Sequence, residues 1–237
     1  MADEGGRAAG GGPQGPRVVA VDPAAPDPAA VAAAVGALGA GALVAFPTDT
    51  LYALAADPFR AGALARVFAA KGRDAAKAVS LLVIDAGMAL RLASRLPPFV
   101  PALMERFWPG PLTLILPPAA GLPAALVPPG GGIGLRAPGG RLSQAILRGL
   151  GGPVVGTSAN RAGGPDPADA DTVLREVGPH LALLLDGGQT PVGAPSTVLD
   201  CLSSPPRLLR VGAVSPAAIR DVVSVLLPEE GSPDPCK

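Results

Sequence analysis

Polar side chains that can bind anions occur in five short clusters of an otherwise apolar sequence, and each cluster borders a segment with the pattern of a β-strand. Hydroxyl, ammonium and guanidinium groups of this kind commonly bind carboxylates and phosphates. The clusters are PTDTLYALA (47–55), AAKGRDAAKAVS (69–80), PGGGIGLRAP (129–138), GTSAN (156–160), and APSTVLD (194–200) together with RLLRVG (207–212).

The first cluster places Thr48, Asp49 and Thr50 directly after an apolar strand, where α/β folds carry ligand-binding groups. Hydroxyls there can bind the ammonium or carboxylate of a polar ligand. An ordinary turn capped by Asp49 explains the motif about equally well, so the motif alone leaves both interpretations open.

The second cluster holds three cations, Lys71, Arg73 and Lys77, at the end of a predicted helix. Arginine can bind a phosphate through two parallel hydrogen bonds, and lysine adds a mobile charge. The alternative is that these cations complement the helix dipole, which is the more common situation for a lone lysine.

The third cluster is rich in glycine. Gly132, Gly134 and Ala137 loosely fit the G-x-G-x-x-A dinucleotide fingerprint. We reject this interpretation because Pro138 follows at once, so no helix begins where a pyrophosphate would need its N-terminus. What remains is Arg136 at the end of a strand, beside glycines that let a carboxylate approach.

Hydroxyl groups also follow two later strands. Ser158 and Asn160 lie in GTSAN, which lacks the second glycine of a G-x-S-x-G nucleophile elbow. The single histidine, His180, lies in an apolar context, so phosphate or adenylate binding is favoured over a Ser-His-Asp triad. Ser196 opens another strand and Arg210 ends the next, where its side chain can reach over a cleft. A surface arginine on an edge strand explains Arg210 equally well.

The elements that must position these clusters alternate between strand and helix patterns over residues 17–227, which predicts one α/β (α+β) domain with a twisted sheet. No helix fits between the strands of 181–211, so the sheet should be mixed. Residues 1–16 and 228–237 are expected to be flexible tails, because they lack periodicity. Strands are predicted at 18–21, 42–46, 79–84, 112–116, 133–136, 153–156, 182–186, 196–200 and 207–211, and helices at 28–39, from Asp57-Pro58 to 72, within 86–107, and at 141–149, 169–177 and 215–227.

The composition excludes several functional classes. The 237 residues carry 19 Lys and Arg against 19 Asp and Glu, so any anion site must be local. The two cysteines, Cys201 and Cys236, exclude a disulfide scaffold and cysteine zinc patterns, and no Walker A motif occurs. No apolar run approaches the ~18 residues that span a bilayer, and no secretory signal is visible, so a cytoplasmic location without membrane contact is expected.

In this order and spacing, the clusters resemble the YrdC/Sua5 family, the threonylcarbamoyl-AMP synthases. The matching segments are FPTDTLYALA, AAKGR with Lys77 downstream, WPGPLTLIL (108–116), IGLRAP, GTSAN, APSTVLD and LLRVG. They cover about residues 40–215, and the chain resembles the short, single-domain form. The resemblance implies a twisted sheet with flanking helices around a large, positively lined concave cavity.

The resemblance also implies a reaction: L-threonine, bicarbonate and ATP, with Mg²⁺, would give threonylcarbamoyl-adenylate and pyrophosphate. A separate tRNA threonylcarbamoyl-transferase complex would then modify adenosine 37 of tRNAs that read codons beginning with A. By motif position, the catalytic residues would be Lys71 and Arg73, with no metal ligands from the chain. The ATP-binding residues would be Arg73, Lys77, Gly132, Ser158, Asn160 and Arg210, and the threonine-binding residues Thr50, Arg136, Gly156 and Ser196.

Such a reaction needs no protein nucleophile, because N-carboxy-threonine can attack the α-phosphate itself while the enzyme positions it and stabilises charge. Two alternatives remain. A YciO-type paralogue or a carbamoyl-transfer module would keep the cavity but change the acceptor. A non-catalytic module that binds tRNA or double-stranded RNA belongs to another class; the neutral charge argues against it, although a local basic cavity is compatible with weak RNA binding.

Overall fold

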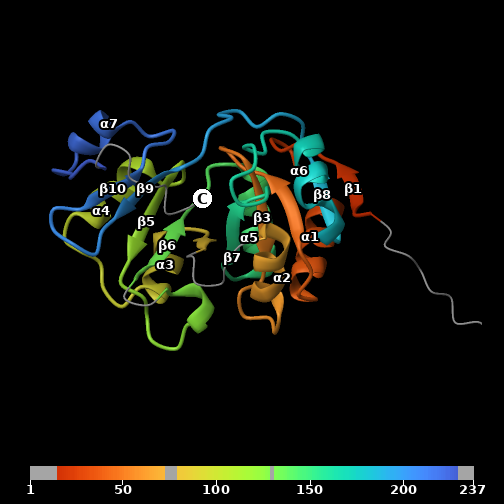
Figure 1. Ribbon diagram of the computed structural model, residues 1–237, viewed down its shortest axis with the longest axis horizontal. Helices are drawn as coiled ribbons and strands as arrows, with labels where there is room; N and C mark the ends of the chain where they lie inside the picture. The colour runs from red at the N-terminus through yellow and green to blue at the C-terminus, as the bar shows by residue number, and fades with distance from the viewer. Residues whose placement is uncertain (1–14, 73–78, 129–130, 229–237) are drawn as a thin grey trace, which may run out of the picture.

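The computed structural model describes residues 15–72, 79–128 and 131–228. Within these ranges, one 10-stranded mixed sheet is flanked by α-helices on both faces (Figure 1). The expected fold class, a twisted mixed sheet with flanking helices, is therefore confirmed. The segments 1–16 and 228–237, expected as tails, lie almost wholly outside the described residues. None of the described helices is both long and apolar enough to cross a membrane.

The strands lie in the order β1-β8-β2-β3-β7-β4-β6-β5-β9-β10, and parallel pairs such as β4–β6 are mixed with antiparallel pairs such as β3–β7. The strands are β1 (Arg17–Ala20), β2 (Val44–Pro47), β3 (Tyr52–Ala56), β4 (Ser80–Leu82), β5 (Leu112–Leu116), β6 (Ile133–Arg136), β7 (Val154–Ser158), β8 (Leu183–Asp186), β9 (Thr197–Asp200) and β10 (Arg207–Arg210). The α-helices are α1 (Pro28–Gly39), α2 (Ala63–Lys71), α3 (Ala86–Leu92), α4 (Val100–Phe107), α5 (Arg141–Leu150), α6 (Ala170–Val177) and α7 (Pro216–Arg220).

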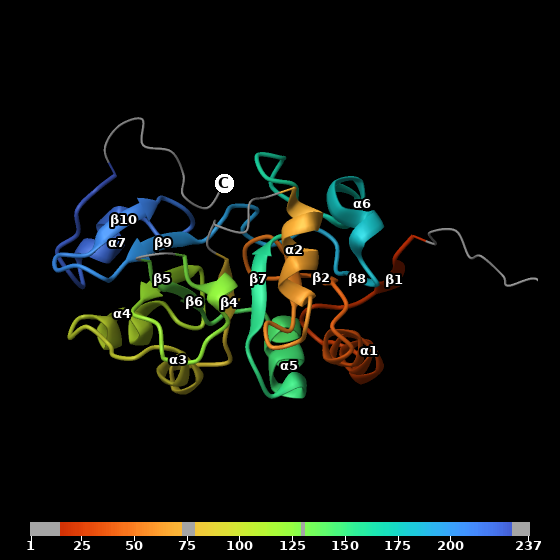
Figure 2. The same cartoon turned by 60° about the horizontal axis from the view of Figure 1, so that its bottom comes forward.

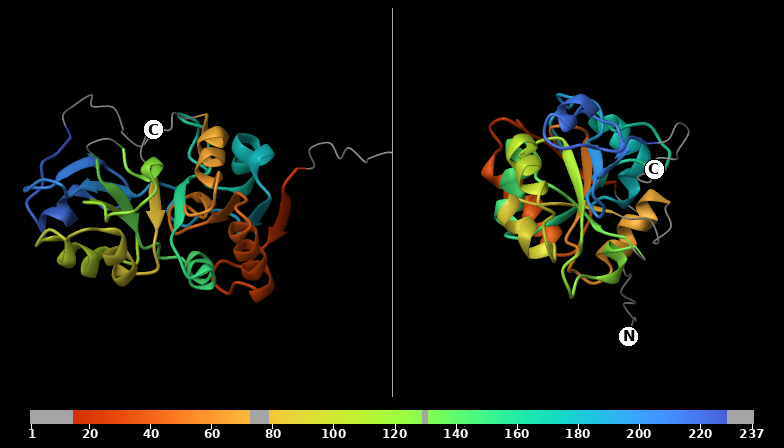
Figure 3. Two further views of the ribbon diagram at one scale, coloured as in Figure 1. Left: turned by 90° about the horizontal axis from the view of Figure 1, so that it is seen from below. Right: turned by 90° about the vertical axis from the view of Figure 1, so that its left-hand side faces the viewer.

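Side chains of the central strands alternate between two buried cores on opposite faces of the sheet, as the two-residue period of a strand requires. On β3, Leu54 and Ala56 belong to one core, and Ala53 and Ala55 belong to the other. Helices α1 and α5 pack side by side over the second core, whereas α2 and α6 lie over the opposite face (Figures 2 and 3). The sheet is thus covered on both faces, and its strand ends are left to build a site.

Local signals fix several element ends as the sequence predicts. Asp27 caps α1 by accepting a hydrogen bond from the Ala29 N–H at 2.8 Å, and Pro28 is the first helical residue. Helix α2 ends at Gly72, which has a left-handed φ of 57° that glycine adopts without steric cost.

One predicted helix begins too early, one strand was not predicted, and the last helix was predicted too long. Asp57 does not start α2; its carboxylate accepts from the Phe59 N–H at 2.9 Å and closes a turn. The helix begins only after Gly62, whose φ of 72° is incompatible with a helix running through it. The prediction also missed β3, which pairs with β2 and β7.

The last helix, α7, is shorter than predicted because the edge of the sheet takes up the backbone that follows it. It ends at Arg220 rather than at 227. The Leu226 N–H donates to the Pro206 carbonyl at 2.9 Å, and the Leu226 carbonyl accepts from the Leu208 N–H at 2.8 Å. This pairing extends the β10 edge and prevents a longer helix.

Candidate active site

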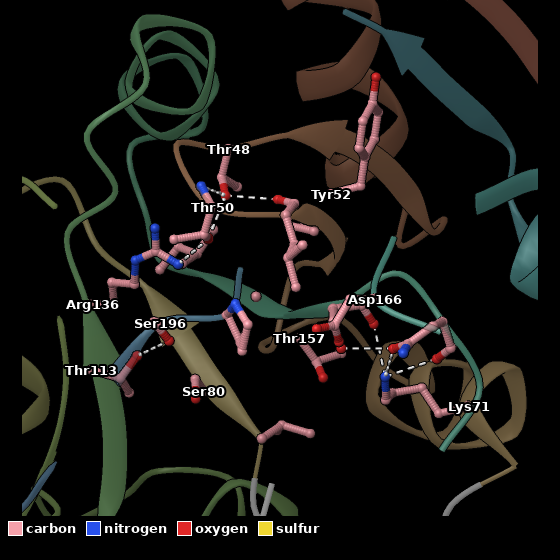
Figure 4. A pocket seen from close by; sticks show the side chains of 18 of the residues that line it. Thr48, Thr50, Tyr52, Lys71, Ser80, Thr113, Arg136, Thr157, Asp166 and Ser196 are labelled. Atoms are coloured by element: carbon pink, nitrogen blue, oxygen red, sulfur yellow. Dashed lines mark hydrogen bonds between the residues drawn. The ribbon is translucent and has the colours of Figure 1, made fainter. Parts of the chain in front are cut away.

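A hollow of about 970 Å³, including the part that is open to solvent, lies over the middle of the sheet, where β3, β7, β4, β6 and β5 run side by side. Its lining comes from all five polar clusters of the sequence, among them Thr50, Lys71, Arg136, Ser158 and Ser196. Figure 4 shows Arg136 and Lys71 on opposite sides of this hollow. The site therefore has two walls, which we call the Arg136 wall and the Lys71 wall.

The first cluster forms the four-residue turn between β2 and β3. Pro47 pairs with Tyr52 across the hairpin, and the Thr48 hydroxyl donates to the Leu51 carbonyl at 2.7 Å and accepts from the Thr50 N–H at 3.1 Å. A hydroxyl that bonds its own backbone in this way stabilises a tight turn. The turn brings the Thr50 hydroxyl to the hollow.

Arg136 is the last residue of β6, and its side chain is only 7% exposed. Its guanidinium donates to the Gly110 carbonyl at 3.0 Å and to the Thr50 hydroxyl at 2.8 Å, and it forms an ion pair with Asp49. Of the five N–H groups of an arginine, these contacts use three, so two are left for a ligand. The guanidinium is thus already oriented before any ligand binds.

Three charges set the electrostatics of the Arg136 wall. Burial lowers the pKa of the Arg136 guanidinium, the Asp49 carboxylate raises it, and the nearby positive charge of Arg210 lowers it again. Arginine stays protonated at neutral pH in any case. Two cations that face one carboxylate leave a net positive charge, which favours an anionic ligand.

Arg210, the last residue of β10, donates to the Ser196 carbonyl at 2.9 and 3.0 Å and to the Ser196 hydroxyl at 3.1 Å. That hydroxyl also lies 2.9 Å from the Thr113 hydroxyl. Behind this contact, the Thr197 hydroxyl donates to the Val214 carbonyl and accepts from the N–H groups of Gly212 and Val214. Thr197 therefore holds the backbone that follows Arg210.

The Lys71 wall joins the end of α2 to the end of β7. Lys71 is 3% exposed, and its ammonium donates to the carbonyls of Ser158 and Asn160 at 2.7 and 2.8 Å and to the Asn160 side-chain oxygen at 3.2 Å. The Ser158 hydroxyl donates to the same oxygen at 2.7 Å. This positive charge thus lies within the wall, among oxygen atoms of the chain.

The structure brings together most of the predicted site residues that it describes: Thr50, Lys71, Arg136, Gly156, Ser158, Asn160, Ser196 and Arg210 line the hollow. Gly132 does not line it; a Cβ atom there would lie 2.6 Å from the Leu116 carbonyl, so this glycine allows close packing on β5. Arg73 and Lys77 lie outside the described residues, and their roles stay predictions.

Further polar residues belong to the site, among them Asp49, Thr113 and Asp166. Asp49 pairs with Arg136, and Thr113 and Asp166 line the hollow. A threonine inside the apolar run LTLIL was a visible signal for Thr113, whereas Asp166 and the partner of Asp49 had none. His180 is exposed and does not line the hollow, and among the described residues no three His, Cys, Asp or Glu side chains gather as a metal site.

Comparison with known proteins identifies the family. The sequence model of the Sua5, YciO and YrdC protein family, which is described as "Telomere recombination", matches residues 36–212. The chain belongs to the Sua5/YciO/YrdC family. The resemblance to this family, which the five clusters predicted, is therefore confirmed.

Relatives of this Sua5/YciO/YrdC chain include the threonylcarbamoyl-AMP synthase of Bacillus subtilis, which is 35% identical over 193 residues, 81% of this chain and 56% of that protein. The threonylcarbamoyl-AMP synthase of Thiobacillus denitrificans is 35% identical over 167 residues, 68% of this chain and 85% of that protein. The crystal structure of Pyrococcus abyssi Sua5 complexed with L-threonine has a TM-score of 0.84 at 31% identity and covers 88% of this chain and 62% of that one. The chain thus spans little more than half of the Bacillus subtilis relative.

Proposed function

We propose that this chain is an L-threonylcarbamoyladenylate synthase, a nucleotidyltransferase that forms threonylcarbamoyl-adenylate and pyrophosphate from L-threonine, bicarbonate and ATP. The observation that carries the proposal is a single hollow in which Arg136 and Arg210 face Lys71 and Ser158. Such a hollow can hold a small amino acid next to a nucleotide. The similarity to a Sua5 structure complexed with L-threonine supports the same assignment.

The Arg136 wall suits the amino acid. The two remaining N–H groups of the guanidinium can bind a carboxylate through parallel hydrogen bonds, which is the strongest geometry for this pair. The Thr50 hydroxyl, which contacts the Arg136 guanidinium, and the Ser196 hydroxyl, which contacts the Arg210 guanidinium, both belong to residues that line the hollow. Each can accept from the ammonium or bond the substrate hydroxyl. We assign threonine to this wall, with Gly156 offering backbone contacts.

The Lys71 wall suits the nucleotide. Ser158 and Asn160 lie at the end of β7, and Lys71 places a positive charge behind them. By motif position, Arg73 and Lys77 would face the phosphates, and Arg210 would reach them from the other wall. Gly132 stays in the ATP-binding set by motif position alone.

The reaction requires no covalent attachment to the protein. After the threonine ammonium loses a proton to solvent, its nitrogen attacks the carbon of bicarbonate and water leaves, which gives N-carboxy-threonine. A carboxylate oxygen of this intermediate then attacks the α-phosphorus, and the bond to the pyrophosphate oxygen breaks. Cations at both walls offset the negative charge, and holding the reactants together can lower the barrier by ~7–11 kcal/mol.

The proposed magnesium ion would arrive with ATP, and the lining offers oxygen atoms that could contact it. The lining offers hard oxygen ligands, the Ser158 hydroxyl and the Asp166 carboxylate, but no cluster of acids within the described residues. When bound, Mg²⁺ would neutralise phosphate charge.

The product would pass to a tRNA threonylcarbamoyl-transferase complex, because an acyl-adenylate is an activated donor. We place this reaction in the cytoplasm. Weak binding of tRNA or double-stranded RNA would rest on the same local cations, since the net charge of the chain is zero.

Pyrophosphate release tests the proposal. Purified protein with ATP, Mg²⁺, bicarbonate and L-threonine should release pyrophosphate, and leaving out threonine or bicarbonate should stop the release. Equal release with L-serine, or without any amino acid, would contradict it. Release that needs a different acceptor would point to a YciO-type paralogue or a carbamoyl-transfer module. Salt-dependent binding of RNA by the protein, without any turnover of ATP, would point to a non-catalytic RNA-binding module.

A further inference from the structure

Every hydrogen-bonding position of the Asn160 side chain is taken by the protein itself. Its oxygen accepts from the Lys71 ammonium at 3.2 Å and from the Ser158 hydroxyl at 2.7 Å. Its NH₂ group donates to the Gly164 carbonyl at 3.0 Å and to the Pro165 carbonyl at 2.9 Å. A carboxamide has two acceptor and two donor positions, so none is left over.

The partners also fix which way the amide points. An ammonium can only donate, so the atom facing Lys71 must be oxygen. Two carbonyl oxygens can only accept, so the atom facing Gly164 and Pro165 must be the NH₂ group. Asn160 is 6% exposed, so water cannot readily replace these partners. A direct contact to a nucleotide would have to break one of these four bonds.

The carbonyls that Asn160 holds belong to a loop that forms the mouth of the hollow. Arg161, Ala162 and Gly163 line the hollow and are exposed. The Ala162 N–H donates to the Lys71 carbonyl at 2.9 Å, so the same lysine holds this loop through its backbone as well. We call residues 161–165 the mouth loop.

A second tie to the mouth loop lies outside the hollow. The Glu176 carboxylate accepts from the Arg161 N–H at 3.0 Å, and the Glu176 carbonyl accepts from the Arg161 side chain at 3.0 Å. Glu176 lies on α6 and does not line the hollow. It can therefore be changed to loosen the loop while every side chain that lines the hollow is kept.

We propose that Asn160 is a positioning residue, which sets the mouth loop against Lys71 and Ser158 and so shapes the nucleotide end of the hollow without itself binding the nucleotide. The functional half of this proposal rests on the proposed ATP-dependent activity. The structural half does not: it concerns the loop in the unliganded protein. The two halves predict different measurements.

The variant Asn160→Asp keeps the accepting oxygen of the side chain and replaces its donating NH₂ group. A carboxylate still accepts from Lys71 and Ser158, but its second oxygen faces the carbonyls of Gly164 and Pro165 and repels them. We expect faster amide hydrogen exchange at residues 162–164 in the unliganded protein, with exchange in the sheet unchanged. We also expect the KM for ATP to rise by about tenfold, which corresponds to the loss of one to two net hydrogen bonds, with a smaller change in kcat.

The variant Glu176→Ala keeps Asn160 and every side chain that lines the hollow. If the loop position matters, this variant should show faster exchange at residues 162–164 and a KM for ATP that rises in the same direction, by less. The matched control is Gln189→Glu, which makes the same amide-to-carboxylate change on an exposed side chain that donates to Asp169 outside the hollow. It should change neither quantity.

The outcomes decide each half. Unchanged exchange at residues 162–164 in Asn160→Asp would overturn the proposal. Raised exchange in both loop variants with an unchanged KM for ATP would overturn its functional half. A raised KM for ATP in Asn160→Asp with no effect on KM in Glu176→Ala would overturn it as well, because this second pattern indicates direct contact between Asn160 and the nucleotide. If the wild-type protein shows no ATP-dependent turnover, the proposed function fails, and the exchange measurement still decides whether Asn160 holds the loop.

Discussion

The Arg136 wall is held to buried segments that adjoin the sheet, whereas the Lys71 wall is held in part to an exposed loop. Arg136 reaches Thr50 in the hairpin turn and Gly110 before β5, and both its own side chain and Thr50 are buried. The Lys71 wall instead binds backbone carbonyls of the mouth loop, whose residues 161–163 are exposed. Regions with exposed backbone and few buried apolar contacts open most easily, so the Lys71 wall should open first.

This difference suits the two proposed substrates. A small amino acid must be oriented at its reacting nitrogen, and a pre-formed guanidinium on a sheet gives that precision. A nucleotide is larger and must enter and leave, which a loop at the mouth allows. If this comparison is right, changes to the Arg136 wall should lower activity with threonine, and changes near the loop should alter exchange and ATP dependence.

The largest expected effect comes from Arg136→Lys. Lysine keeps the positive charge but loses the planar fork that bonds Thr50, Asp49 and a carboxylate at once. We expect kcat/KM for threonine to fall by about 10- to 150-fold, equivalent to about 1.5–3 kcal/mol. The control is Arg91→Lys, an exposed arginine on α3. If kcat/KM for threonine fell by less than about threefold in Arg136→Lys, the planar guanidinium would not be what binds the carboxylate.

Thr197→Val tests the support behind Arg210. Valine has nearly the same shape but cannot accept from the N–H groups of Gly212 and Val214, which leaves one half-buried and one buried donor without their partner. We expect the free energy of unfolding in urea to fall by about 2 kcal/mol or more, with the KM for ATP raised because Arg210 is less well held. An unchanged unfolding midpoint would mean that this wall is less rigid than its contacts indicate.

Gly156→Ala tests the floor between the two walls. A Cβ atom at Gly156 would lie 2.2 Å from the Leu82 Cγ atom, so Leu82, which also lines the hollow, would have to move. We expect a loss of about 1 kcal/mol or more in the free energy of unfolding and a weaker binding of threonine. The matched control is Gly152→Ala, where nothing lies within 4 Å. Equal stability of the two variants would show that Leu82 moves aside at no cost.

The sequence predicted most of the site because the signals for it are local. The capping pair Asp27-Pro28, the stop at Gly72 and the apolar runs each act within a few residues. The predicted strand end at Arg136 placed that side chain at the hollow. Residue types then predicted anion binding at positions that the structure brings to one hollow.

The rest could not be predicted because it depends on contacts between distant residues. Arg136 meets Thr50, which is 86 positions away, and no local pattern indicates that pairing. Strand β3 was missed because the turn residues before it look like a loop, whereas its pairing with β7 is what makes it a strand. Asn160 was predicted to bind ATP from its motif, and only the structure shows how its four hydrogen bonds are used.

The smallest expected effect, which is confined to high pH, concerns Tyr52, the single tyrosine of the chain and the first residue of β3. Its backbone closes the ends of the segment that contains the mouth loop: the Ala159 N–H donates to the Tyr52 carbonyl, and the Tyr52 N–H donates to the Pro167 carbonyl. Its phenol donates to the Gly188 carbonyl at 2.7 Å and accepts from the Gly187 N–H at 3.1 Å.

Burial raises the pKa of Tyr52 to about 12; the Gly187 N–H opposes this rise, and the Asp186 carboxylate adds to it. In the unfolded chain the phenol should titrate near its ordinary pKa of about 10. Below pH 10 both states keep the proton, so stability is unaffected. Between pH 10 and 12 only the unfolded state loses it, so the free energy of unfolding should fall as the pH rises through this window.

Phenolate absorbance, which only this residue can give, should show a midpoint near pH 12 in the folded protein and near pH 10 in urea. A midpoint near pH 10 in both would place the ring in water and contradict its burial against Gly187 and Gly188.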